Sequence, residues 1–196
     1  ALPIGVTVSY TNNDQIAAGT YTVTANINGG ANYQDATISA SMTIQKAQLT
    51  SVSFSSVTIP YDGTVKSIYI SGTLPATAVV TYQNNGQINL GTYPIVASIV
   101  GGNNYEDLVL NATLTIEKGV LSNVYLPSAT YTYDGQQKSL QIGGSTLPQG
   151  VTVSYVNNGH TDAGIYTVRA EINGGANYQN RVLQSLLTIN RASIEN

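Results

Sequence analysis

The amino-acid sequence predicts an all-β protein made of tandem antiparallel β-sandwich modules of about 72 residues, joined in a linear rod. One stretch, Gly-x-Tyr running to Gly-Gly-x-Asn-Tyr, occurs three times, at residues 18–33, 90–105 and 163–178, with offsets of 72 and 73 residues. Within each copy, apolar residues alternate with polar ones at period two, as in half-buried strands. No window places apolar residues at i, i+3, i+4 and i+7, the spacing that a helix requires.

The repeat marks divide the chain into four parts. These are an incomplete module with only the later strands (1–45), two full modules (46–117 and 118–190), and the start of a further repeat (191–196). Lys46-Ala47, Lys118-Gly119 and Arg191-Ala192 occupy the same place in the repeat. No linker rich in Pro, Gly or Ser separates the modules, so we expect strand to follow strand and the rod to be stiff.

Residues 1–45 lack the first half of a module. A half-sandwich leaves an apolar face and strand edges uncovered, which is unstable in isolation. Two explanations remain open. Either the array is truncated here, or strands of another chain complete the half-module.

In the third copy, strands are expected near 119–126, 130–133, 137–143, 151–156, 165–173 and 181–190. Val151, Val153 and Tyr155 share one face of their strand, and Asn-Asn, Gly-Gly and Asp-Gly pairs supply the turns between strands. Six short strands without a helix favour a two-sheet sandwich over a β-grasp.

Asp162-Ala163-Gly164-Ile165-Tyr166 resembles the corner that opens strand F of immunoglobulin-like domains, so the modules are expected to be Ig-like. The Gly-x-Tyr part recurs in every copy. Tyr21, Tyr93 and Tyr166 are therefore predicted to be structural corner tyrosines, with a buried ring and a hydroxyl bonded to nearby backbone.

Both full copies carry a further set of spaced motifs. They are Tyr61-Asp62-Gly63 and Tyr133-Asp134-Gly135, Lys66-Ser67 and Lys138-Ser139, Leu74-Pro75 and Leu147-Pro148, an Asn-Tyr pair, and a final Thr-Ile strand. This set resembles the MBG and YDG-type repeats of large bacterial surface proteins, which are related to bacterial Ig-like domains. The resemblance implies an extracellular, repeated, adhesin-type stalk or display segment.

Composition narrows the class of protein further. Charged residues are 9% of the chain, the net charge is -3, and the seven basic residues are spread along the sequence, which argues against nucleic acid as a partner. Cysteine is absent, so neither disulfides nor a thiol nucleophile are available. The apolar runs are too short for membrane insertion in this segment, and a signal or anchor is expected outside it.

Few titratable side chains could act together in catalysis or binding, and we predict no enzyme activity, catalytic residue, cofactor or metal site. His160 does not recur and is expected to be a solvated loop residue. Asp62 and Asp134 precede Gly in turns, where an Asp side chain normally bonds the backbone rather than calcium. Lys66 and Lys138 raise the possibility of a Lys to Asn cross-link, but no acid recurs to assist it, so solvated lysines are expected.

The chain has fourteen Tyr but one Phe and no Trp. Most of the tyrosines recur at the same position in each repeat, which indicates that they lie in the core or at a corner. Tyr69, Tyr125 and Tyr131 each occur in one copy only and are candidate ligand contacts, for example stacking on a sugar face.

The leading functional prediction is a structural stalk of a bacterial cell-surface adhesin, extracellular on the cell surface or secreted. One alternative is a module that binds host glycan, mucin or protein. The other is a self-assembling subunit that completes residues 1–45 by strand donation. Neighbouring repeats of the same chain are also expected partners.

Overall fold

The computed structural model describes residues 1–194, and this part of the chain contains fifteen β-strands and no helix. The prediction of an all-β fold is confirmed. The chain divides into two compact units. The first comprises residues 1–55, 69–84 and 94–112, and the second comprises residues 56–68, 85–93 and 113 onward.

The strands of the first unit are β1 (Thr7–Thr11), β2 (Gly19–Asn28), β3 (Ala36–Ile44), β4 (Val52–Ser53), β6 (Ser71–Gly72) and β7 (Val79–Gln83). Those of the second unit are β5 (Val57–Pro60), β10 (Val124–Tyr125), β11 (Ala129–Thr132), β12 (Gly143–Gly144), β13 (Thr152–Val156), β14 (Gly164–Asn173) and β15 (Arg181–Asn190). Two further strands, β8 (Gly91–Val100) and β9 (Leu108–Glu117), contribute to both units.

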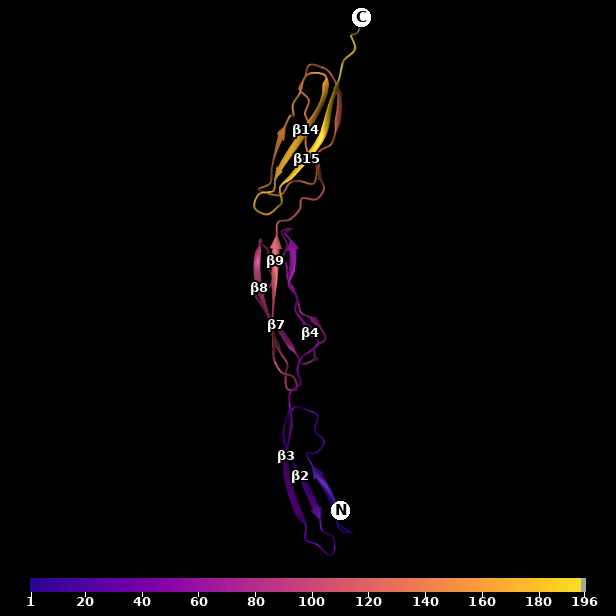
Figure 1. The fold of residues 1–196 in the computed structure, drawn as a ribbon, viewed down its shortest axis with the longest axis vertical. Coiled ribbons are helices and arrows are strands. Elements are labelled where there is room, and N and C mark those ends of the chain that lie inside the picture. Colours follow the sequence, from indigo (N-terminus) through magenta and orange to yellow (C-terminus); the bar gives the residue numbers. More distant parts are fainter. Residues whose placement is uncertain (195–196) are drawn as a thin grey trace. The chain divides into compact units, whose positions relative to one another are not determined.

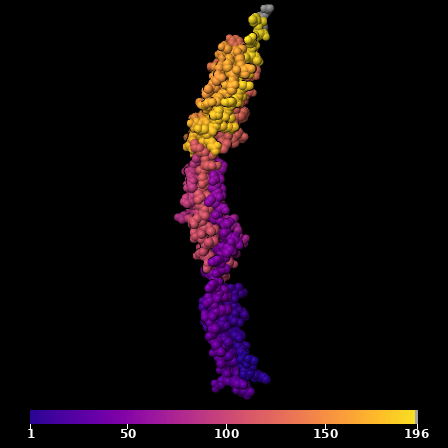
Figure 2. All heavy atoms as spheres, in the orientation of Figure 1, coloured from indigo at the N-terminus to yellow at the C-terminus, as the bar shows by residue number. Residues whose placement is uncertain are grey.

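The third repeat folds as two sheets. The larger has the order β11-β15-β14-β13, in which β11 pairs with β15 in parallel and the other neighbours are antiparallel. The smaller is the antiparallel pair β10-β12. Figure 1 shows the long strands β14 and β15 side by side, and in Figure 2 their orange and yellow atoms meet on the visible face of this unit.

The core of the third repeat lies between these two sheets. Val168 and Ala170 of β14 and Leu187 of β15 are fully buried, and they form one cluster with Leu126 and Leu140 from the segments beside the smaller sheet. Alternation along β14 buries every second residue, as the period-two pattern predicted. The two-layer sandwich expected from the sequence is confirmed.

The same sheet orders recur in the second repeat, as β5-β9-β8-β7 and β4-β6. The register is also conserved between repeats. Val80 lies opposite Ile99 in the second repeat, and Val153 lies opposite Ile172 in the third.

Two predicted strands are much shorter than expected. Within 119–126 only β10 is a strand, and within 137–143 only Gly143, the first residue of β12, is in a strand. The reason is that side chains take the place of a neighbouring strand: the Asn158 amide bonds both the N–H and the carbonyl of Leu140, and the Arg181 guanidinium donates to the Leu121 carbonyl.

The first repeat is a single three-stranded sheet with the order β1-β2-β3. Its inward residues Val23, Ala25 and Ile27 are only half-buried, whereas the equivalent residues of β8 and β14 are fully buried. This sheet presents an uncovered apolar face.

Candidate functional site

The corner tyrosines occupy equivalent places in all three repeats. The hydroxyls of Tyr21, Tyr93 and Tyr166 donate to the carbonyl four residues earlier, at 2.8, 2.9 and 2.9 Å. This is the geometry of a tyrosine corner. In the third repeat the preceding glycine gives the ring room, because a Cβ on Gly164 would lie 2.9 Å from the Tyr166 ring and would push the ring away. Each corner fixes the chain where the central long strand begins.

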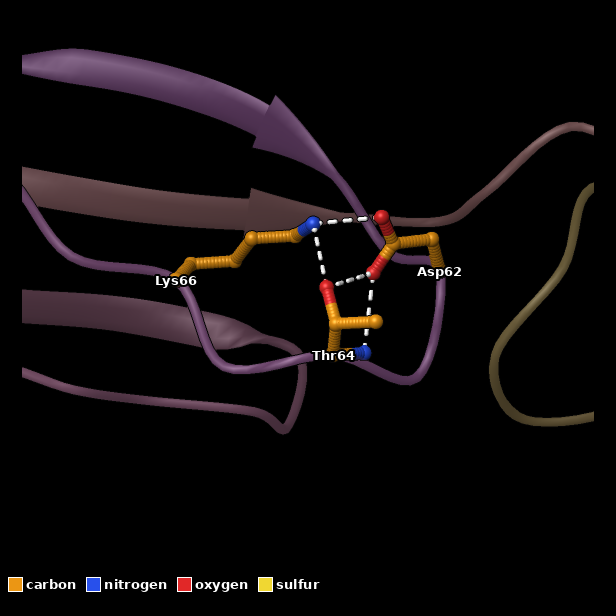
Figure 3. Close-up of polar contacts among 3 residues, drawn as sticks. All are labelled: Asp62, Thr64 and Lys66. Atoms are coloured by element: carbon orange, nitrogen blue, oxygen red, sulfur yellow. Dashed lines mark hydrogen bonds and ion pairs between the residues drawn. The ribbon is translucent and has the colours of Figure 1, made fainter.

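The Tyr-Asp-Gly loop is closed by its own aspartate (Figure 3). Asp62 Oδ1 accepts from the Thr64 N–H at 2.9 Å and from the Thr64 hydroxyl at 2.6 Å, while Oδ2 accepts from Lys66 Nζ at 2.5 Å. The Lys66 ammonium, followed by the Thr64 groups, holds the pKa of Asp62 well below its ordinary value near 3.8. The carboxylate is therefore ionised in this turn, and its predicted backbone-bonding role is confirmed.

The third repeat builds the same loop. Asp134 accepts from the Gln136 N–H at 2.9 Å and from Lys138 Nζ at 2.5 Å, and these contacts lower the pKa of Asp134. Lys138 also lies 5.5 Å from the centre of the Tyr131 ring, a cation–π contact.

The expectation of solvated lysines was wrong. The side chains of Lys66 and Lys138 are only 13% and 18% exposed, because they lie along the loop and end on the aspartates. Each lysine amine pairs with the carboxylate of its own turn rather than with an amide. An ionised ammonium of this kind is a poor nucleophile for a cross-link.

Backbone bonds fix the segment that enters the third repeat. The Gly119 N–H donates to the Asn177 carbonyl and the Gln179 N–H donates to the Gly119 carbonyl, both at 2.9 Å. Lys118 Nζ donates to the Gly175 carbonyl at 2.8 Å. The connecting residues are therefore held like a strand rather than left as a free linker.

The Tyr-Asp-Gly loop of the second repeat reaches this same junction. The Tyr61 ring packs edge-on against the Tyr178 ring, with ring centres 5.6 Å apart. A Cβ on Gly119 would lie 2.1 Å from the Tyr61 carbonyl oxygen, so only glycine fits between the two repeats here. The recurring Tyr-Asp-Gly and Asn-Tyr motifs thus meet in space.

The entry to the second repeat uses the same bonds. The Ala47 N–H donates to the Asn104 carbonyl and the Glu106 N–H donates to the Ala47 carbonyl, both at 2.9 Å. Lys46 Nζ donates to the Gly102 carbonyl at 2.8 Å. Both junctions are therefore built by one recurring device.

His160 is not the solvated loop residue that the sequence suggested. Its backbone forms a bridge with Lys138, and its ring stacks on the Tyr166 ring at 3.6 Å between centres with an interplanar angle of 5°. The imidazole Nε2 lies 3.0 Å from Asn157 Oδ1. His160 thus covers the corner tyrosine of the third repeat.

The three candidate ligand tyrosines lie in different settings. Tyr69 is 67% exposed and stands edge-on against Tyr82, with ring centres 5.4 Å apart. Tyr125 is exposed over Gly143, where an added Cβ would meet its ring at 3.0 Å. Tyr131 is partly covered by Lys138. No ring contact joins any two of the three within the described chain.

Sequence reasoning missed the role of the second asparagine in each Asn-Asn pair. The first asparagine takes a positive φ at Asn84 and Asn157, as expected of a turn. The second, Asn85 or Asn158, makes two bonds to the main chain of Ile68 or Leu140 at 2.7 to 3.1 Å. The signal was present in the recurrence of both asparagines, not only the first.

Two further properties concern the described residues as a whole. Residues 1–194 contain no cluster of three His, Cys, Asp or Glu side chains that could hold a metal ion. These residues also include no helix that is both long enough and apolar enough to cross a membrane.

Comparison with known proteins gave matches of two kinds, and no curated protein sequence matched the chain. Similar solved structures include the titin domains Z1Z2 in complex with telethonin, at 15% identity and TM-score 0.34 over 74% of this chain and 98% of that one. Drosophila N-cadherin EC1-4 is similar at 10% identity and TM-score 0.27, over 87% and 57%. A SusE-like surface-located polysaccharide-binding protein from Bacteroides thetaiotaomicron is similar at 13% identity and TM-score 0.29, over 96% and 36%.

The family model of the MBG domain matches residues 122–193. This range contains all six strands from β10 to β15 and both sheets of the third repeat. The resemblance inferred from the Tyr-Asp-Gly, Lys-Ser and Leu-Pro motifs is confirmed for this range, and the chain therefore contains an MBG domain.

Proposed function

We propose that the chain is a segment of a stalk, in which repeats hold another part of a bacterial surface protein away from the cell. The proposed location is extracellular, on the cell surface or secreted. The observation that carries the proposal is the recurring junction: at both Ala47 and Gly119 the connecting residue makes two backbone hydrogen bonds to the repeat that it enters. Because these bonds hold the connecting residue within the repeat that it enters, little free linker is left between repeats, and a short linker is what a stiff spacer requires.

Side-chain chemistry supports the same role. Two charged pairs recur, Lys66 with Asp62 and Lys138 with Asp134, and each pair closes a turn. The recurring tyrosines close corners or pack at the junction. These residues stabilise the repeats, and we propose no catalytic role for them.

Small-angle scattering tests the stalk. A compact chain of this length would have a radius of gyration of about 16 Å. Three repeats in line, each at least as long as its ten-residue strands, would span roughly 100 Å and give roughly 30 Å. A value near 16 Å would refute the proposal. As a control, a four-residue insertion, Gly-Ser-Gly-Ser, after Glu117 should broaden the distribution of interatomic distances.

A second candidate function rests on Tyr69. This ring is held by Tyr82, which in turn packs against Phe54 at 5.9 Å between centres. An exposed, fixed aromatic ring suits stacking on the apolar face of a sugar. Phe54 and Tyr69 have no aromatic counterparts at Leu126 and Gln141, so such a site would belong to the second repeat alone.

Glycan-array binding tests this candidate. We expect Tyr69→Ala to abolish any glycan signal. Tyr125→Ala, at another exposed tyrosine in the third repeat, should preserve it. Equal binding by both variants would reject a site at Tyr69.

A further inference from the structure

A pocket recurs near the start of each complete repeat. Its volume is about 310 Å³ in the second repeat and about 220 Å³ in the third. Both pockets are lined by a leucine, two hydroxyl side chains, a proline and a tyrosine at equivalent positions. These are Leu49, Thr50, Thr73, Pro75 and Tyr105 in the second repeat, and Leu121, Ser122, Thr146, Pro148 and Tyr178 in the third. The proline of the Leu-Pro motif and the tyrosine of the Asn-Tyr motif therefore meet in one pocket of each repeat.

The apolar part of the third-repeat pocket is held in place by the core. Leu121 and Val124 are 5% and 3% exposed, and the half-buried Tyr178 packs against the cluster that they form. The Tyr61 ring, which also lines the pocket, stands edge-on to Tyr178. Gly119 lies so close to Tyr178 that an added Cβ would be 3.2 Å from the ring. The aromatic wall is therefore formed before any ligand arrives, which reduces the entropy lost on binding.

The polar part of this pocket consists of hydroxyl groups. Ser122, Ser145 and Thr146 line it, and none of their hydroxyls has a hydrogen-bond partner within residues 1–194. Each hydroxyl is both a donor and an acceptor. The pocket therefore offers three hydroxyls to a ligand.

One carboxylate, that of Asp62, completes the lining. A carboxylate has about four acceptor positions. Three of them are used by the Thr64 N–H, the Thr64 hydroxyl and the Lys66 ammonium, as Figure 3 shows. One acceptor position is left, and a hydrogen bond to a charged group is stronger than one to a neutral group.

These groups favour one class of ligand. No Lys, Arg or His lines the third-repeat pocket, so it has no basic group to bind a phosphate, sulfate or carboxylate. Lys66 already neutralises Asp62, so no unpaired negative charge attracts a cation. What the pocket presents is aromatic rings and a proline beside hydroxyls and one carboxylate oxygen. A sugar ring matches this set, because it carries an apolar C–H face and a rim of hydroxyls.

We propose that the pocket of the third repeat binds a neutral sugar unit, with the C–H face of the sugar on the tyrosine rings and its hydroxyls bonded to Asp62, Ser122 and Thr146. The pocket is smaller than the roughly 300 to 1,000 Å³ of sites for drug-sized ligands, so it takes one ring. A ligand of that size binds weakly, with a Kd on the order of 1 mM. The equivalent pocket of the second repeat takes the same class of ligand, and repeated weak sites give avidity for a polysaccharide. This inference goes beyond the stalk function and does not depend on it.

Nuclear magnetic resonance tests the proposal on the whole chain. The ¹⁵N-labelled protein is titrated separately with the methyl β-glycosides of glucose, galactose and N-acetylglucosamine, each to about 50 mM so that a millimolar site saturates. At least one of the three should produce saturable amide shifts at Leu121, Ser122, Thr146 and Tyr178. The absence of saturable shifts at these amides with all three glycosides would overturn the proposal.

A pocket-filling variant shows whether the ligand enters the pocket. Thr146 is exposed, so Thr146→Trp should fill the cavity without disturbing the core, and the remaining amide spectrum checks the fold. We expect binding in the third repeat to weaken at least tenfold, while the shifts at Thr73 and Tyr105 of the second repeat persist. Thr130→Trp, at another exposed threonine outside the pocket, should change neither.

Two results of the variant experiment would contradict the site. Third-repeat shifts that saturate at the same glycoside concentration in Thr146→Trp as in the unaltered chain would place the ligand outside the pocket and overturn the proposal. Shifts confined to Tyr69 and its neighbours would also overturn it and would support the separate candidate at Tyr69.

Discussion

Replacing Gly119 with alanine should open the junction in front of the third repeat. The new Cβ would lie 2.1 Å from the Tyr61 carbonyl oxygen, so the two backbones must separate by about 1 Å to restore an ordinary contact. That movement weakens two backbone hydrogen bonds worth about 1 kcal/mol each. It also disturbs the Tyr61–Tyr178 contact, which contributes about 1 kcal/mol. We expect the free energy of opening the junction to fall by about 2 kcal/mol.

Amide hydrogen exchange measures this change residue by residue. A loss of about 2 kcal/mol corresponds to roughly 30-fold faster exchange at the Gly119 and Gln179 amides. The first junction provides a control in the same molecule, because the amides of Ala47 and Glu106 make the same bonds and should keep their rates. Unchanged exchange at Gly119 and Gln179 would refute the assignment of this junction as a close backbone contact.

Three further predictions concern stability in chemical denaturation. Ile99→Ala should cost about 3 kcal/mol because this side chain is 1% exposed, whereas Ile27→Ala, at the same repeat position on the uncovered sheet, should cost about 1 kcal/mol. Tyr166→Phe should cost about 1 kcal/mol through loss of the bond to the Asp162 carbonyl. Because its folded pKa is lowered, Asp62 stabilises the fold above its ordinary pKa near 3.8, and this stability is lost as the pH falls below that value. Asp62→Asn should therefore reduce the fall in stability between pH 5 and pH 2.

Each of these predictions has a result that would contradict it. Equal losses from Ile99→Ala and Ile27→Ala would mean that the first sheet is covered in solution. A cost from Tyr69→Phe as large as that from Tyr166→Phe would remove the special role of the corner. If stability falls between pH 5 and pH 2 by the same amount in Asp62→Asn as in the unaltered chain, the ion pair of this loop does not contribute to folding stability.

Local rules explain how much of the fold was predictable from the sequence. The long strands β13, β14 and β15 follow the period-two pattern closely, because alternation and flanking turn residues act within a few positions of each other. The short strands β10 and β12 were overestimated. The nearby backbone groups of Leu121 and Leu140 are instead bonded by the side chains of Arg181 and Asn158, which lie 60 and 18 residues further along the chain.

The residues of the candidate site also fall into two groups, those whose setting was predicted from the sequence and those whose setting was not. The corner at Tyr166 could be predicted because its partner carbonyl lies only four residues away. The low exposure of Lys66 was not predicted although its partner Asp62 also lies four residues away, because a lysine side chain was expected to extend into solvent rather than to lie along the loop.

The sequence by itself determined the repeat length, the all-β fold, the turns and the corners, since these arise from patterns repeated within each copy. Only the tertiary structure decided what the repeated motifs do together. It brings Tyr61 onto Tyr178 across a separation of more than one repeat and packs the Tyr61 carbonyl against Gly119. Contacts between distant residues depend on how complete sheets pack, and no local pattern encodes that packing.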